Sequence, residues 1–157
     1  MERLRAPSAG RAYFEDLEVG HRFGGASYEV PREEMLDFAR KWDPRPIHVD
    51  ERAGREAGFG GVIASGAYTT AIFTLLSMRS RKAAGDHAVI AGLGAESRLP
   101  EPVRPGDTLT FGGEISAKRE SASRPDAGVV HTRARLTNQQ GAVVYECETA
   151  TLVQKRP

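Results

Sequence analysis

The chain holds a single cysteine, Cys147, among 157 residues. An internal disulfide is therefore impossible, and the absence of disulfides is typical of a reducing compartment, so we expect a cytoplasmic location. Cys147 lies in a run rich in β-branched residues, where a cysteine more often acts as a small buried hydrophobic side chain than as a reactive thiol.

Long apolar runs are missing too, because no stretch approaches the roughly 20 residues that cross a bilayer. We therefore expect no association with a membrane. The first twelve residues are basic but lack the apolar part of a secretory signal. We expect residues 1–12 to form a flexible N-terminal arm and residues 13–157 to form one domain.

An excess of charge of either sign is also lacking, with 22 lysines and arginines against 21 aspartates and glutamates. No overall field recruits nucleic acid. His21, His87 and His131 are scattered and lack the spacing of metal ligands. The glycine-rich residues 58–61 are not followed by the Lys-Ser/Thr pair of a phosphate-binding loop. We expect no metal, no other cofactor and no nucleic-acid partner.

The first half of the chain reads as a strand followed by helices. Residues 24–30 are expected to form a short strand, and Pro31 suits the first position of a helix. That helix has one face of apolar residues at the spacing i, i+3, i+4 and i+7, namely Met35, Phe38, Ala39 and Trp42. Asp50 suits the N-cap of a short polar helix that ends near residue 57.

A longer helix is expected over residues 64–78, where small and apolar residues fall on every side. A helix that is apolar all round is buried on all sides, so we place it in the centre of the domain. Four segments rich in β-branched residues follow, separated by turn residues: 87–99, 108–119, 128–137 and 142–154. The predicted fold class is α+β, with an antiparallel sheet wrapped around the helix. Such a sheet leaves an unpaired edge that a second copy would cover, so we expect at least a homodimer.

The run from Asp43 to His48 reads Asp-Pro-Arg-Pro-Ile-His and places a carboxylate and an imidazole five residues apart. Proline disfavours the α conformation for the residue before it, so Asp43 and Arg45 are expected to be extended. Each proline also fixes its own φ. We expect a stiff, non-helical segment in which Asp43 and His48 converge on one small site, as proton transfer requires.

These elements, in this order, resemble the hotdog fold, and more narrowly the MaoC-like dehydratases and (R)-specific enoyl-CoA hydratases. The family motif Asp-x-Asn-Pro-x-His-x-Asp resembles residues 43–50, and its Ile-x-His-Gly resembles residues 63–66. Residues 102–109 are similar to the turn that the family carries between its strands. The resemblance covers residues 13–154, nearly the whole chain.

The resemblance implies that Asp43 and His48 hold a water and share the proton transfers that add it across the 2,3-double bond of an acyl thioester. The thioester would be carried by coenzyme A or by an acyl-carrier protein. The resemblance also implies that Gly66 presents its backbone N–H to the thioester carbonyl. Physical chemistry supports this role, because a helix N-terminus offers free N–H groups and a positive dipole end where negative charge builds up.

Three further residues are expected to contact the substrate. Arg45 and Ser65 stand where the family has asparagine and histidine, beside the expected site. Thr74 lies two helical turns after Gly66, where relatives carry a hydroxyl. Three basic residues at the end of the helix either complement its dipole or meet coenzyme A phosphates, namely Arg79, Arg81 and Lys82. Arg104 could also line the pocket mouth and meet these phosphates.

Other functions stay open from the residues alone. Aspartate before proline is a common turn former, and a lone histidine is usually structural. A hotdog thioesterase would use a carboxylate and a helix N-terminus to hydrolyse the thioester. A non-catalytic acyl-binding subunit would keep the fold without turnover, and loss of Asp43 or His48 would indicate it. Because both are present, the sequence favours hydration.

Overall fold

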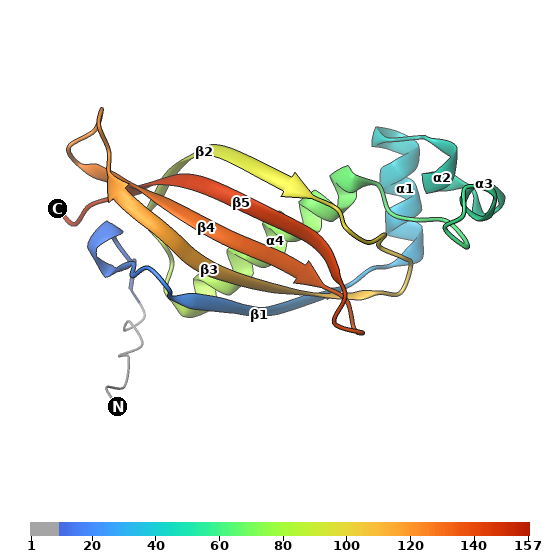
Figure 1. Ribbon diagram of the computed structural model, residues 1–157, viewed down its shortest axis with the longest axis horizontal. Helices are drawn as coiled ribbons and strands as arrows, with labels where there is room; N and C mark the ends of the chain where they lie inside the picture. The colour runs from blue at the N-terminus through green and yellow to red at the C-terminus, as the bar shows by residue number, and fades with distance from the viewer. Residues whose placement is uncertain (1–9) are drawn as a thin grey trace.

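The computed structural model describes residues 10–157, and in it a long helix lies along one face of a five-stranded antiparallel sheet (Figure 1). In chain order the elements are η1 (Phe14–Asp16), β1 (Arg22–Glu29), α1 (Arg32–Trp42), α2 (Pro46–Val49), α3 (Glu51–Glu56), α4 (Gly66–Ala84), β2 (Val89–Arg98), β3 (Thr108–Glu120), β4 (Ala127–Thr137) and β5 (Val143–Gln154). The strand order is β1-β3-β4-β5-β2. Helices α1 to α3 gather beyond one end of the sheet, near the start of α4 (Figure 1).

The expected N-terminal arm falls mostly on residues 1–9, which lie outside the described residues. Its last residue, Ala12, is buried and belongs to the core. The backbone N–H of Ala12 donates to the carbonyl of Asp86, and its own carbonyl accepts from Ala88. The chain is therefore held against the start of β2 already at residue 12.

Helix α1 begins one residue after Pro31 and ends at Trp42, where the backbone N–H of Asp43 still donates to the carbonyl of Ala39. Met35 and Ala39 are buried as the apolar spacing predicts, but Trp42 is mostly exposed. The prediction is wrong for Trp42 because the residue lies in the last turn of the helix. There its ring instead lies under the ammonium of Lys41, 5.0 Å from the ring centroid.

The segment after α1 differs from the prediction in one respect. Asp43 and Arg45 have non-helical backbone angles, as the following prolines require. Residues 46–49, however, form the single turn α2, so the expectation of a wholly non-helical segment is wrong for His48. The reason is that Pro46 occupies the first helical position, where its missing N–H and fixed φ are no disadvantage. Asp50 caps α3 as predicted, accepting from the backbone N–H of Ala53 at 2.8 Å.

Helix α4 packs one side into the core and leaves the other uncovered. Tyr68, Ile72, Phe73 and Leu76 are buried, and the Phe73 ring lies 5.4 Å from that of Phe111 on β3. The opposite side is exposed and consists of Ala67, Thr70, Ala71, Thr74 and Met78. The prediction that this helix is buried on all sides is therefore wrong for a single chain, because the sheet covers only one side of it.

Strand β2 forms an open edge of the sheet. It pairs with β5 alone, and nine of its ten residues are exposed, among them Ile90 and Leu93. Cys147 on β5 is buried, as its sequence context predicts. Within residues 10–157 no helix combines the length and the apolar character needed to cross a membrane.

Candidate active site

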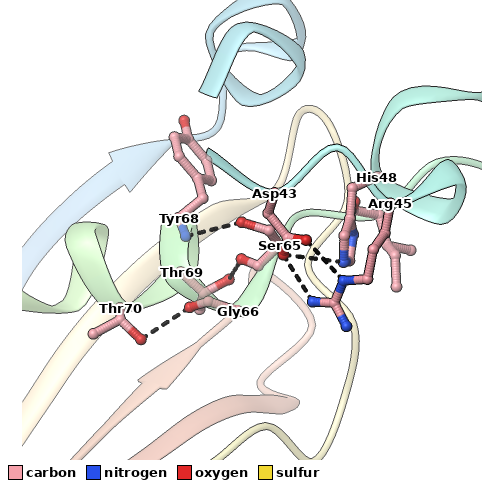
Figure 2. A network of polar contacts seen from close by, with 9 residues as sticks. Asp43, Arg45, His48, Ser65, Gly66, Tyr68, Thr69 and Thr70 are labelled. Carbon is pink, nitrogen blue, oxygen red and sulfur yellow. Dashed lines mark hydrogen bonds and ion pairs between the residues drawn. The ribbon is translucent and has the colours of Figure 1, made fainter. Parts of the chain in front are cut away.

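The two candidate catalytic side chains meet at the start of α4. Asp43 follows the last residue of α1, and His48 lies in α2 (Figure 2). Backbone hydrogen bonds connect the segment before α4 to α2 and to the loop between β2 and β3. The N–H of Ile63 donates to the carbonyl of Ile47, and the N–H of Ala64 donates to the carbonyl of Val103. These bonds place the helix start beside α2.

His48 is 4% exposed, and its ring is oriented by one hydrogen bond. Nδ1 lies 2.9 Å from the backbone carbonyl of Ile63. A carbonyl can only accept, so Nδ1 carries the proton and Nε2 presents a lone pair. Nε2 is buried, finds no hydrogen-bond partner among residues 10–157, and lies 3.6 Å from Oδ2 of Asp43. The imidazole is thus held as a base that faces a carboxylate.

Asp43 also accepts a bidentate hydrogen bond from Arg45. The guanidinium donates from Nε to Oδ1 and from Nη2 to Oδ2, both at 2.7 Å. This bidentate hydrogen bond is the main reason that the pKa of the Asp43 carboxyl lies below its usual range, and it outweighs partial burial, which raises the pKa. The positive charge of Arg45, and that of His48 when it is protonated, lowers the pKa further. The Asp43 side chain is 16% exposed and that of Arg45 is 66% exposed, so the arginine covers the acid from the solvent side.

The ionised carboxylate and Nε2 of His48 are both hydrogen-bond acceptors. Two acceptors 3.6 Å apart can both receive hydrogen bonds of about 2.8 Å from one water molecule. Such a water has both hydrogens directed at basic groups, and its own lone pairs are free to attack. The spacing of the two atoms therefore suits one shared water, which is the arrangement that general acid–base catalysis needs.

At the N-terminus of α4, Ser65 caps the helix and Gly66 presents a backbone N–H that is free within residues 10–157. Ser65 is fully buried, and its hydroxyl oxygen accepts the N–H of Tyr68 at 3.1 Å, so Ser65 caps the helix. Among the described residues nothing accepts the N–H of Gly66, the first helical residue. A Cβ at Gly66 would lie 3.4 Å from a methyl of Leu99, so this leucine contacts the backbone beside the free N–H.

Thr74 lies on the exposed side of α4, in one row with Gly66. Its hydroxyl donates to the carbonyl of Thr70 at 3.0 Å, and the Thr70 hydroxyl lies 2.9 Å from the carbonyl of Gly66 and 3.2 Å from the hydroxyl of Tyr145. The sequence reasoning missed Thr70, although the spacing of four residues from both Gly66 and Thr74 was a usable signal. It also missed Leu99, which only the return of β2 brings to the helix start.

The basic residues at the end of α4 lie far from this site. Arg79 lies thirteen positions after Gly66 along the helix, which corresponds to roughly 20 Å. Arg104 lies much nearer, since its guanidinium donates to the carbonyl of Phe59 in the loop that precedes α4. Of the four arginines and lysines expected near coenzyme A phosphates, a single chain therefore brings only Arg104 to this end of the molecule.

The other histidines stand apart from the site. His87 precedes β2 and is half-buried; burial, aided by the positive charge of Arg81, lowers its pKa to about 4. His21 stacks on Phe23, with ring centroids 6.4 Å apart. In residues 10–157 no group of three or more His, Cys, Asp or Glu side chains is arranged to hold a metal ion.

Comparison with known proteins places this chain among relatives of similar length. The family model of the MaoC like domain matches residues 17–138. The crystal structure of the MaoC-like dehydratase from Rhodospirillum rubrum is 39% identical, covers 93% of this chain and 99% of its own, and superposes with a TM-score of 0.82. The hotdog fold expected from the sequence is thereby confirmed.

Two further relatives are more distant. The (R)-hydratase from A. caviae involved in PHA biosynthesis is 25% identical, covers 91% of this chain and 99% of its own, and has a TM-score of 0.69. The uncharacterized protein YdeM of Bacillus subtilis (strain 168) is 29% identical over 142 residues, which is 90% of this chain and 98% of YdeM. At the level of the family, these likenesses support a hydratase or dehydratase.

Proposed function

This chain belongs to the MaoC-like domain family, and from that premise we propose that it is a hydro-lyase acting on acyl thioesters. It adds water to the 2,3-double bond of an enoyl thioester, or removes water from the 3-hydroxyacyl thioester. One observation carries the proposal: the Asp43–His48 pair, with its two acceptors 3.6 Å apart, stands beside the start of α4, where the N–H of Gly66 has no acceptor among the described residues.

The reaction needs a base for the water and a stabilising group for the negative charge, and the proposal assigns both. Attack of water on C3 requires a base, which is the Asp43–His48 pair. As the C3–O bond forms, the π electrons move toward the thioester and negative charge grows on its oxygen. The N–H of Gly66 and the positive end of the α4 dipole stabilise this charge. Return of a proton to C2 completes the addition, and the reverse sequence dehydrates the hydroxyacyl thioester.

The substrate in this proposal is an acyl-CoA or an acyl-carrier thioester. The (R)-hydratase of A. caviae, which shares the fold over nearly its whole length, supports hydratase chemistry. Arg45 and Thr74 remain proposed substrate contacts, with Thr74 along the exposed side of α4. Ser65, which is fully buried, would act on the site through the helix cap and not by contact with the substrate. A cytoplasmic location, in keeping with the single cysteine, is part of the same proposal.

We also propose a homodimer. The open edge of β2 and the exposed side of α4 both carry apolar groups that water does not favour, with Leu93 54% and Met78 63% exposed. Pairing of two β2 edges would extend one sheet through both copies and satisfy their free backbone groups. Because Leu99, one residue past β2, contacts Gly66, such a dimer would bring the second copy close to the active site.

The proposed function is tested with crotonyl-CoA as the substrate. Loss of the enoyl-thioester absorbance without release of free thiol is the expected result, and His48→Ala should abolish it. Release of free coenzyme A would instead identify a thioesterase. Binding of the thioester without turnover by the unmodified protein, across short and medium acyl chains, would refute the hydro-lyase and indicate a non-catalytic acyl-binding subunit.

A further inference from the structure

Arg45 occupies an unusual position beside the proposed acid–base pair. It stands between Pro44 and Pro46. Pro46 restricts the Arg45 backbone to the extended region, with φ −60° and ψ 140°, and Pro44 has a fixed φ of its own. From there its guanidinium reaches back two residues to both carboxylate oxygens of Asp43. The rigidity of the Pro-Arg-Pro unit and the planar fork of the guanidinium together fix the direction of the carboxylate.

This bidentate hydrogen bond from Arg45 disfavours protonation of Asp43. Both of its oxygens already accept a charge-assisted hydrogen bond, and protonation would remove the negative charge that strengthens both bonds. Arg45 and His48 are the charged or titratable groups that act on Asp43. Residues 62–65, which pack against His48 from the other side, are valine, isoleucine, alanine and serine and carry no charge. Partial burial raises the pKa of the Asp43 carboxyl, but the bidentate hydrogen bond from Arg45 outweighs it and keeps Asp43 ionised.

The His48 imidazole, unlike the Asp43 carboxylate, has a nitrogen that is free to accept a proton. Its Nδ1 proton is committed to the carbonyl of Ile63, while Nε2 is buried and has no partner among residues 10–157. Nε2 can take a proton without weakening any existing hydrogen bond, whereas protonation of Asp43 would weaken both bonds from Arg45. Once protonated, it becomes a cation 3.6 Å from the Asp43 carboxylate, which stabilises it.

We propose that Arg45 is a positioning residue that holds Asp43 as a carboxylate throughout turnover, so that both proton transfers of the reaction pass through Nε2 of His48. The water oxygen bonds to C3, and one water proton moves to Nε2. The electron pair of the double bond passes to the thioester as an enolate beside Gly66. The imidazolium then gives that proton to C2, which restores the thioester carbonyl and the neutral imidazole. Asp43 gains and loses no proton; it accepts the second O–H of the water.

This inference deepens the proposed function, and its first test needs no activity. The carboxyl carbon of Asp43 is followed by NMR in ¹³C-labelled protein as a function of pH, with Asp43→Asn identifying the signal. In the unmodified protein, Asp43 should titrate below the usual range for an aspartate. Arg45→Gln should move the midpoint upward. Arg40→Gln, which removes a similar exposed pair with Asp37, should leave it unchanged.

The second test uses the pH dependence of kcat/KM for hydration. In the unmodified protein the acidic limb should follow a single ionisation, because only His48 changes its charge. Arg45→Gln should add a second ionisation from Asp43 and lower kcat/KM at neutral pH by about tenfold or more, since the carboxylate is no longer aligned. Arg45→Lys should keep kcat/KM between the values of Arg45→Gln and the unmodified protein, because lysine supplies the positive charge but not the two parallel N–H donors of the guanidinium.

The outcomes separate this inference from the function on which it rests. If Arg45→Gln leaves the Asp43 titration where it was, the role of Arg45 is refuted, whether or not the protein hydrates enoyl thioesters. If the titration shifts but the acidic limb of the rate profile is unchanged, turnover does not depend on the ionised state of Asp43, and the proposal fails. If the titration shifts and no hydration is found, the positioning by Arg45 stands and the proposed function falls. Arg45 is mostly exposed, so the Gln variant should keep its fold, which thermal unfolding checks.

Discussion

Replacing Gly66 with proline should remove a single hydrogen-bond donor from the proposed site while leaving helix α4 intact. Gly66 is the first residue of α4, the position at which proline is best tolerated. Ser65 already has φ −68° and ψ 150°, which is the conformation that a following proline prefers. The cap bond from the N–H of Tyr68 to Ser65 does not involve residue 66.

The expected cost follows from the role of the N–H. Because nothing among the described residues accepts it, the donor is free for the thioester oxygen, and it lies at the positive end of a helix of 19 residues. Removal of one such donor typically lowers kcat by about 100- to 1000-fold, or about 2.7–4 kcal/mol in the transition state. We expect Gly66→Pro to fall in this range.

Gly66→Ala is the matched control. It keeps the N–H and adds a Cβ 3.4 Å from a methyl of Leu99, which is an ordinary contact. The assay is steady-state hydration of crotonyl-CoA, and equal thermal unfolding midpoints of the two variants check that the helix start is unharmed. If Gly66→Pro turns over within a few-fold of Gly66→Ala, the N–H does not stabilise the transition state and the reasoning is refuted.

Three further predictions address the acid–base pair, the assembly and the pH dependence of stability. Asp43→Asn and His48→Ala should each lower kcat about 100-fold or more, and the double variant should be little worse because both act on one water; near-normal hydration by either single variant would contradict the assignment. Leu93→Lys on the β2 edge should yield monomers by light scattering, whereas Val19→Lys, at a similarly exposed apolar residue, should not; a dimer that survives Leu93→Lys would exclude this edge. The folded-state pKa of His87, about 4, lies below its ordinary value of 6.5, so the unfolded chain takes up the proton first. The neutral His87 side chain therefore contributes fully to the free energy of unfolding above pH 6.5, and this contribution is lost as the pH falls toward 4. The stability lost in urea unfolding between pH 7 and pH 4.5 should therefore be smaller in His87→Gln, and an equal loss in both proteins would refute this.

Local chemistry explains why much of the site was predictable from the sequence. Proline restrictions act on the neighbouring residue whatever the rest of the chain does, so the extended backbone of Asp43 and Arg45 followed directly from the Asp-Pro-Arg-Pro run. The cap at Asp50 and the start of α4 at Gly66 are likewise decided within a few residues. The order of elements followed from periodicity and turn residues, whereas the hotdog fold was expected from the resemblance of this order and of the short motifs to a known family.

Tertiary structure alone decided which groups touch. Arg45 was expected beside the site as a substrate contact, but its bidentate grip on Asp43 depends on side-chain directions that spacing does not determine. The hydrogen bond from Nδ1 of His48 to Ile63, which leaves Nε2 as the base, joins residues 15 apart in the chain. The exposure of one side of α4 was also hidden, because composition tells how apolar a helix is and not how far a curved sheet reaches around it. Contacts between distant segments depend on the packing of the whole chain, and local sequence does not carry that information.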